Sequence, residues 1–375
     1  MNIQYKKLKL NTRKKDIVKV AAAVLIVTAV TLFTKFDYFL YNDMIATVTS
    51  VENVKCDGTY EGRETYYVQN LTLKIKNTAK KGTVVTAYNK YFYSQIDSTK
   101  YNVGDDLFVV ESETDAQAVK ILKTKVDTYA VFIIVSFLTV VILIAGKKGI
   151  MSISSLFVNI LIFVLALNKF IKSENIELTT IVVTFLFVVL TLIILNGFTK
   201  KSFGAILSSL TTVLLVYILY VIVYRFGDRP YFEMMDYIFG NENLEALFLS
   251  SVIMGLLGAV MDVSITITSS VYEIVNTAKE PTVQSLVKSV KEISHDIMGT
   301  MINVLFFSYL SGSIPMFLIK AKNGYSFVNL VRFDIIFELL RFLLGSIGIV
   351  LAIPVSGVMA ILLFGKGLKR HADHS

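Results

Sequence analysis

Residues 178–197 read LTTIVVTFLFVVLTLIILNG, without one charged side chain. A helix needs about 20 apolar residues to cross the ~30 Å hydrocarbon core of a bilayer, so this stretch predicts a membrane-spanning helix. Further apolar runs of similar length lie on both sides of it: Ile17–Phe36, Thr128–Ala145, Ile150–Leu167, Phe203–Tyr224, Leu244–Ile267, Ile297–Ile319 and Ile335–Phe364. The sequence therefore predicts an α-helical polytopic membrane protein with about eight transmembrane helices.

The composition supports a membrane protein and argues against a nucleic-acid partner. Of the 375 residues, 54% are hydrophobic, and the mean hydropathy is +0.63. Soluble domains have only about 45–50% apolar residues. The net charge is +8, but the Lys and Arg residues flank the apolar runs, which is typical of topology signals. The lipid bilayer is therefore the expected partner, and nucleic acid is not.

The basic residues also predict which side of the membrane each loop faces. They gather in the N-terminal tail and in every second loop: Lys6–Lys15, Lys147–Lys148, Lys200–Lys201, Lys279–Lys291 and Lys366–Arg370. Because cytoplasmic loops carry an excess of Lys and Arg, eight spans place both termini in the cytoplasm. A cleaved signal peptide is the alternative for the first span, but no small-x-small cleavage site precedes Phe36.

Residues 41–125 differ in kind, because polar and apolar residues alternate there. Leu71, Leu73 and Ile75 alternate with polar neighbours, which predicts a strand with one buried face. Two more strands and then a helical period are expected at Thr83–Tyr88, Asp106–Val110 and about Thr114–Thr124.

Gly82 and Gly104 fall between these strands and mark turns, since glycine reaches positive φ without cost. The segment predicts a small extracytoplasmic β-barrel or sandwich that is OB-like. Such a barrel suggests an oligonucleotide or sugar ligand. A structural or partner-contact module is the preferred interpretation, because a fold alone does not give a function.

Three parts follow from these patterns. Residues 1–40 hold a cytoplasmic tail and the first transmembrane helix, 41–125 the extracytoplasmic β-rich domain, and 126–375 the transmembrane helical bundle. Within the bundle, apolar residues at helical spacing predict an amphipathic cytoplasmic loop helix near 279–294, with Pro281 in its first turn.

The strongest candidate for function is a carboxylate inside a predicted span. Asp262 and Thr266 share a helical face, and Gly255, Gly258 and Ala259 precede them at spacings that let helices pack closely. A charge at bilayer depth is costly and usually faces the bundle interior or water. The functional interpretation is a proton- or cation-linked carboxylate in a transport path. The structural one is a carboxylate that is hydrogen-bonded to neighbouring helices.

A second polar group opens the following predicted span. Asp296 is expected to stabilise the helix N-terminus there, and its alternative role is a proton relay with His295. Asn303 lies deeper, with Gly299 four residues earlier on the same face, and is expected to bond across helices.

A third polar group lies in the last predicted span. Glu338 and Arg341 are three residues apart and can pair on one helix, either as an anchor or as a substrate contact. Gly345 and Gly348 follow on a face that we interpret as a packing face.

The sequence contains no catalytic constellation. His-Glu-x-x-His, Gly-x-Ser-x-Gly and Walker A patterns are all absent. The single cysteine, Cys56, and three histidines offer neither a disulfide nor a Cys- or His-rich metal site, so no metal or cofactor is expected. An intramembrane aspartyl enzyme needs two converging acids, and Asp262 and Asp296 lie in different helix contexts.

Several separated segments occur together in order along the chain. They are Lys81-Gly82, Asn89, Val103-Gly104-Asp105, Gly258-Ala259-Val-Met-Asp262-Val, His295-Asp296-Ile-Met-Gly299-Thr300-Met with Asn303, and Glu338 with Gly345-Ser-Ile-Gly348 and Pro354. In these segments the chain resembles the YibE/YibF-like family of bacterial membrane proteins, from about Ala46 to Phe364. The resemblance implies the topology and a bacterial plasma membrane, and it carries over neither an activity nor catalytic residues.

Polar residues on small-residue faces of three spans favour a permease for a small solute or ion. The alternatives are a non-transporting envelope scaffold or sensor that acts through residues 41–125, and a membrane enzyme. The same glycine faces are compatible with a homo-oligomer or a partner membrane protein, although one bundle needs them too.

Overall fold

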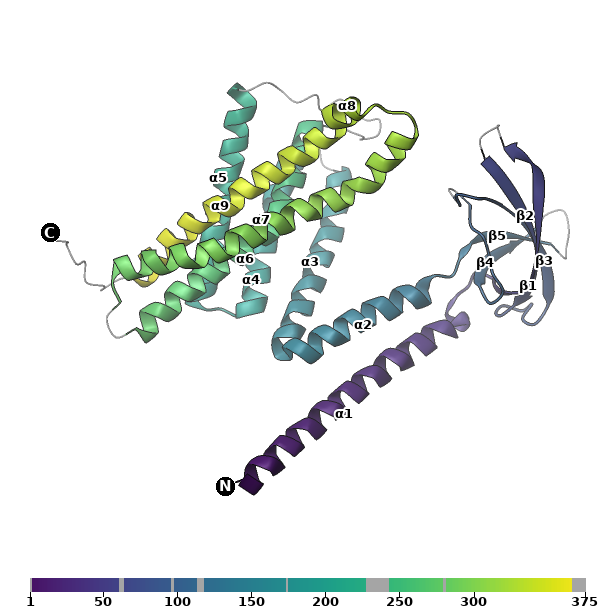
Figure 1. Ribbon diagram of the computed structural model, residues 1–375, viewed down its shortest axis with the longest axis horizontal. Coiled ribbons are helices and arrows are strands. Elements are labelled where there is room, and N and C mark those ends of the chain that lie inside the picture. The colour runs from purple at the N-terminus through teal and green to yellow at the C-terminus, as the bar shows by residue number, and fades with distance from the viewer. Residues whose placement is uncertain are drawn as a thin grey trace. The chain divides into compact units, whose positions relative to one another are not determined.

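The computed structural model describes residues 2–60, 64–95, 98–112, 118–172, 175–226, 243–278 and 281–365 (Figure 1). Two compact units divide the chain, Met1–Gly149 and Ile150–Ser375. Among the described helices, eight are long and apolar enough to cross a membrane. The predicted architecture is therefore confirmed: a mostly helical multi-pass membrane protein with an N-terminal β-barrel domain.

In the first unit, one helix precedes the β-domain along the chain and another follows it. α1 (Asn2–Lys35) precedes it, followed by a short 3₁₀ turn, and α2 (Asp127–Ala145) follows it. The two helices pack on each other. No residue of α2 is buried and more than half of its residues are exposed, so a large part of its apolar surface is available to lipid.

The β-domain is a nearly closed five-stranded barrel. Its strands are β1 (Ile45–Tyr60), β2 (Glu64–Ile75), β3 (Val84–Phe92), β4 (Asp106–Glu111) and β5 (Val119–Thr124). They pair in the order β3-β2-β1-β4-β5, and a parallel bridge between Thr86 and Ala118 brings β3 to β5. This order is that of an OB-like barrel. Leu71, Leu73 and Ile75 are all buried in its core, as their alternation predicts.

The sequence prediction misses two of these strands. The helical period expected at Thr114–Thr124 is wrong, because Val119–Thr124 is β5, with Val119 buried and Leu122 exposed at strand periodicity. In β1, register shifts after Val48 and after Lys55 break the alternation on which the prediction depends. The predicted turns are correct, since Gly82 and Gly104 have φ of +92° and +97°.

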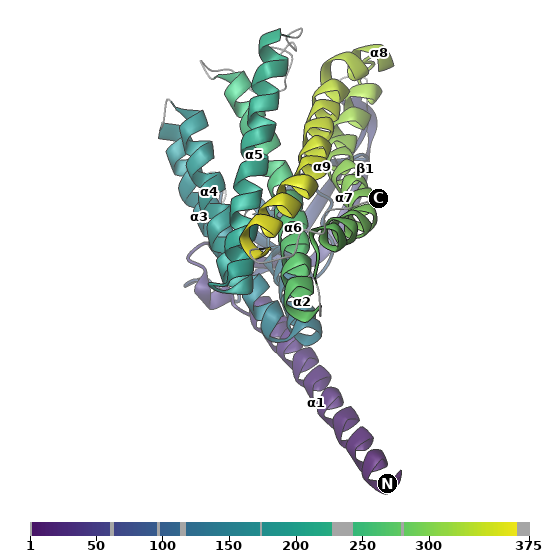
Figure 2. The same cartoon turned by 90° about the vertical axis from the view of Figure 1, so that its left-hand side faces the viewer.

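The second unit is a helical bundle. Its elements are α3 (Lys147–Lys172), α4 (Ile176–Asn196), α5 (Lys200–Phe226), α6 (Leu244–Thr277), α7 (Val283–Lys322), α8 (Phe327–Leu330), a π-helical turn (Val331–Ile335) and α9 (Ile336–Phe364). α6 packs against α4, α5, α7 and α9 and is the most buried of the spans (Figure 2). α9 runs parallel to α6, since contacts between Gly348 and Leu256 and between Ser356 and Ser264 advance together along both helices.

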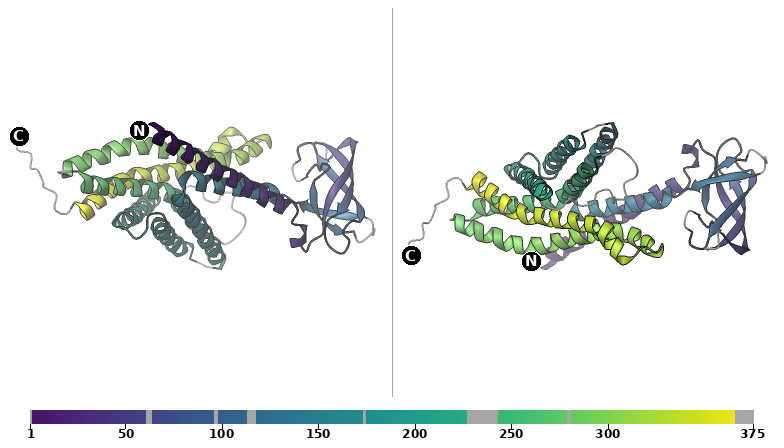
Figure 3. Two further views of the ribbon diagram at one scale, coloured as in Figure 1. Left: turned by 90° about the horizontal axis from the view of Figure 1, so that it is seen from below. Right: turned by 90° about the horizontal axis from the view of Figure 1, so that it is seen from above.

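α7 is one continuous helix of 40 residues that runs alongside α9 (Figure 3). The expected loop helix near 279–294 is its first part, and Leu286 and Val290 there are buried as the amphipathic pattern predicts. Thr282 caps the helix, so Pro281 lies before the cap and not in the first turn. Asp296 is far inside α7, and its expected position at a helix N-terminus is therefore wrong.

Candidate functional site

The carboxylate of Asp262 lies on an exposed face of α6. Asp262 and Thr266 are both exposed, and the Thr266 hydroxyl donates to the backbone oxygen of Asp262 at 2.7 Å. Within the part of the chain that the structure describes, no group pairs with the Asp262 carboxylate. The chain's own helices therefore do not hold this carboxylate. A charge exposed within a membrane span is favoured only where water or another protein lies beside it.

The polar residues of α7 are exposed as well, and two of them share the depth of this carboxylate. Gly255 of α6 lies against the hydroxyl of Tyr309 on α7, and the two helices are antiparallel neighbours. Asp262 lies seven residues after Gly255, and Asn303 lies six residues before Tyr309. Each is therefore ~10 Å along its helix from the Gly255–Tyr309 contact, in the same direction. Thr266 and Gly299 are likewise at a similar distance from this contact, because they lie eleven residues after Gly255 and ten residues before Tyr309.

We call Gly258, Asp262, Thr266, Gly299 and Asn303 the Asp262 band. All five are exposed, and a Cβ atom added at either glycine would meet nothing within 4 Å. The residue count thus gives members of two predicted polar segments a similar depth on neighbouring helices, without a direct contact between them among the described residues. His295 and Asp296 are also exposed on α7, one turn or more before Gly299.

The other predicted small residues lie in helix contacts. A Cβ at Gly345 would be 2.6 Å from Leu305, and one at Gly348 would be 3.3 Å from Val216. Ala259 packs against the hydrophobic core of the bundle. These positions keep helix axes close and do not line an open surface.

Glu338 and Arg341 form a separate polar centre. The Arg341 guanidinium donates to Glu338 at 2.6 Å and to the Ser251 hydroxyl at 3.1 Å, and it lies 5.4 Å from the centre of the Phe248 ring. Ser251 precedes Asp262 by about three turns of α6, or ~16 Å. The structure thus does not place this ion pair beside the Asp262 band. Glu338 instead borders a small hollow of about 60 Å³.

Sequence reasoning misses a seam of hydroxyl groups between α5, α6 and α9. Ser208, Thr212, Ser264, Thr268 and Ser356 are all fully buried. Ser356 donates to Ser264 at 3.1 Å, and the two hydroxyls of α5 donate to carbonyls of their own helix. Small residues at four-residue spacing along α5 are the signal that could have revealed it. Four of these five hydroxyls are hydrogen-bonded, and only that of Thr268 among the five has no hydrogen-bond partner, so we interpret the seam as a packing feature.

A second feature that the sequence does not reveal lies where the β-domain joins its two helices. The Lys125 side chain is 1% exposed, and its ammonium is 2.9 Å from both Asp37 and Asp127. It also donates to the Thr34 carbonyl at 2.7 Å, in the last turn of α1. Burial alone lowers the pKa of a lysine, but the two carboxylates outweigh it, so the pKa of Lys125 lies above its ordinary value. We call these residues the Lys125 cluster.

Two tyrosines complete the Lys125 cluster. Tyr38 donates to Asp106, and Tyr41 donates to Asp127. Burial first, and then the Asp106 carboxylate, raise the pKa of Tyr38 to about 12. The hydrogen bond to Asp127, with burial, raises the pKa of Tyr41 to about 12. The cluster therefore ties the end of α1, the barrel and the start of α2 into one electrostatic unit.

The described residues include no group of three His, Cys, Asp or Glu side chains that could hold a metal ion. His371 and His374 lie outside the described residues. The chemistry open to the Asp262 band is therefore that of one carboxylate with hydroxyl and amide neighbours.

Two family models match the chain. The model of the YibE/F family N-terminal domain matches residues 39–124, and the model of the YibE/F-like protein matches residues 133–366. No curated protein and no solved structure matches it. The first match coincides with the barrel, and the second covers the helices from α2 to α9, including both polar centres.

Proposed function

The chain belongs to the YibE/F-like family, and from that premise we propose that it is a permease for a small solute or ion. The observation that carries the proposal is the unpaired carboxylate of Asp262 at the middle of α6. Asp262 is ~27 Å along the helix from Leu244 and ~22 Å from Thr277. Exposure of a carboxylate to the centre of the hydrocarbon core costs about 3 kcal/mol, which a water-filled path avoids.

The neighbours of Asp262 are suited to a hydrated cation or a proton. Thr266 supplies a hydroxyl at the same face, and Asn303 supplies an amide at the same depth on α7. Gly258 and Gly299 leave space beside them. As part of this proposal the path crosses a bacterial plasma membrane, as the family resemblance implies, and the basic loops support cytoplasmic positions for both termini.

Flux measurements test the role of Asp262. The full chain is reconstituted in liposomes that contain a pH-sensitive dye, and proton flux is recorded after a potassium diffusion potential is imposed. Parallel runs use sodium and potassium gradients without a pH difference. Asp262→Asn should abolish the flux that the wild type shows. Glu292→Gln, an exposed carboxylate of α7 outside the band, is the matched control and should leave it intact. Wild-type flux in the Asp262→Asn variant contradicts the proposal.

The second candidate function is a non-transporting envelope scaffold or sensor. The observation that favours it is the Lys125 cluster, which fixes the barrel to α1 and α2 and so lets a load on the barrel reach the membrane. A scaffold keeps its cellular phenotype in Asp262→Asn and loses it when residues 41–125 are replaced by a short linker. A permease that depends on the Asp262 band instead loses its phenotype in Asp262→Asn.

A further inference from the structure

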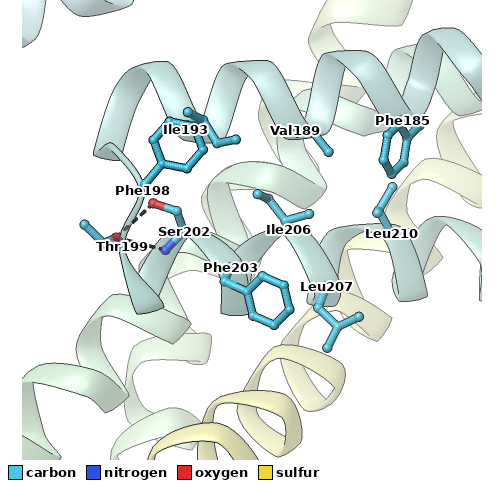
Figure 4. Close-up of a pocket in the computed structure, with 10 residues that line it drawn as sticks. All are labelled: Phe185, Val189, Ile193, Phe198, Thr199, Ser202, Phe203, Ile206, Leu207 and Leu210. Carbon is cyan, nitrogen blue, oxygen red and sulfur yellow. Dashed lines mark hydrogen bonds between the residues drawn. The ribbon is translucent and has the colours of Figure 1, made fainter.

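A groove of about 540 Å³ runs between α4 and α5, away from the Asp262 band (Figure 4). Eight of the ten side chains that line it are Phe, Val, Ile or Leu. Phe198 and Phe203 border it and are 91% and 61% exposed. The walls therefore offer a ligand no hydrogen bonds along most of their length, and the groove suits a hydrocarbon chain.

The length of the groove matches one leaflet of a bilayer. Along α5 it extends from Thr199 to Leu210, which is ~16 Å of helix. Half of a hydrocarbon core is ~15 Å thick. A second helix is a poor occupant, because a helix of ~10 Å diameter and this length fills roughly 1,200 Å³. A single acyl chain therefore fits the space better than a helix does.

One end of the groove is polar and is fixed by hydrogen bonds. The Thr199 hydroxyl accepts from the Ser202 amide at 3.2 Å and bonds the Ser202 hydroxyl at 2.9 Å, and Ser202 donates to the Gly197 carbonyl at 2.7 Å. α5 begins there at Lys200, so free amide groups and the positive end of the helix dipole lie at the same place.

The two lysines at this end differ in what they contact. Lys201 pairs with Glu273 of α6 at 2.8 Å and lies 5.0 Å from the Tyr272 ring centre. Lys200 is exposed and directly follows Thr199, which lines this end of the groove. An exposed cation at the boundary of an apolar groove complements a lipid phosphate.

We propose that the α4–α5 groove binds one acyl chain of an anionic phospholipid, whose phosphate lies against Lys200 and the first turn of α5. The apolar walls select the chain, and Lys200 selects the charge of the headgroup. The site is independent of the proposed transport activity.

Native mass spectrometry of the full chain in detergent tests the groove. The probes are dioleoyl phosphatidylglycerol and dioleoyl phosphatidylcholine, which share their acyl chains and differ in charge. Leu207→Trp and, from the opposite wall, Val189→Trp fill the groove and should remove the bound-lipid peaks. Leu214→Trp is the matched control, since Leu214 is 56% exposed on the same helix outside the groove. It should bind lipid like the wild type.

The headgroup is tested by charge removal. Lys200→Gln should lower binding of phosphatidylglycerol about fivefold and leave phosphatidylcholine unchanged, the effect expected for one lysine near a lipid surface. Lys148→Gln, an exposed lysine in another loop, should change neither.

Three results overturn the proposal. The first is wild-type lipid binding in both groove-filling variants while their melting temperatures show that they are folded. The second is equal loss of both lipids in Lys200→Gln. The third is loss of a dimer peak on filling the groove with lipid peaks retained, which assigns the groove to a second copy of the chain.

Discussion

The glycine residues of the bundle fall into two groups: those at which an added Cβ atom would touch a neighbouring side chain, and those at which it would meet open space. At Gly204 of α5, a Cβ would lie 2.7 Å from the methyl group of Thr268, in the fully buried hydroxyl seam. At Gly258 of α6 it would meet nothing within 4 Å. Thr268 is β-branched and stiff, so it cannot move aside easily. The first glycine is required by packing, and the second is not.

Alanine substitutions should therefore have opposite effects at these two positions. Gly204→Ala should lower the free energy of unfolding by about 1–3 kcal/mol through overpacking. Gly258→Ala should raise it by up to about 1 kcal/mol through helix propensity. Thermal unfolding of the full chain in detergent, followed by circular dichroism, measures both. Equal destabilisation by the two substitutions would contradict the packing seen at the α5–α6 interface.

The sequence shows which residues are polar but not which face of a helix its neighbours cover. The alternation of Leu71, Leu73 and Ile75 was sufficient to predict which side of the strand is buried, because a strand has only two faces. Asp262 was correctly identified as a polar residue within a span. Its lack of a partner depends on where α7 and α9 pack, and no local pattern encodes that. The burial of Ser208 and Thr212 could not be predicted from the sequence. A hydroxyl that donates to a carbonyl of its own helix, as both do, can lie on a buried or on an exposed face.

At the scale of elements, the Lys125 cluster should dominate the stability of the junction between the barrel and its helices. Lys125→Met leaves Asp37 and Asp127 without their cation, and loss of one buried partner costs about 3 kcal/mol. Lys80→Met is the control, because Lys80 pairs with Glu111 on the surface and such pairs contribute about 0–1 kcal/mol. Hydrogen exchange of barrel peptides, measured by mass spectrometry, should show a large loss of protection in Lys125→Met and little loss in Lys80→Met. Equal protection in the two variants would rule out the structural role of Lys125.

The same cluster gives a pH dependence of known sign. The pKa values of Lys125, Tyr38 and Tyr41 lie above those of the unfolded chain, which are about 10. Their contribution to stability is therefore fully present below about pH 10 and is lost as the pH rises toward about 12. In the exchange experiment, barrel protection should be flat near neutrality and fall above about pH 10, less steeply in Lys125→Met.

The elements themselves were predictable to different degrees. Long apolar runs gave spans that agree with α2, α4 and α5 to within a few residues. The continuity of α7 was missed because Ser294, His295 and Asp296 resemble a helix boundary. Backbone hydrogen bonds of a helix do not depend on side-chain polarity, so the helix continues through them.

At the scale of the whole molecule, the alternation of basic loops predicts one topology. The barrel should lie outside the cytoplasm and the α2–α3 and α4–α5 turns inside it. In a Cys56→Ser background, Tyr93→Cys should react with a membrane-impermeant maleimide on intact cells, because Tyr93 is 77% exposed. Lys148→Cys and Lys200→Cys, both exposed, should react only after permeabilisation. The reverse labelling pattern would invert the topology and place the barrel in the cytoplasm.

The unbroken length of α7 has a mechanical consequence. From Val283 to Pro315 the helix is ~48 Å long, which is longer than the ~30 Å hydrocarbon core. Asn303 lies ~30 Å from the Val283 end, before Pro315 interrupts the helix. If that part of α7 moves as one body, a displacement of the Val283 end also displaces Asn303. The length of α7 alone therefore connects its Val283 end to the depth of Asp262 through a single helix.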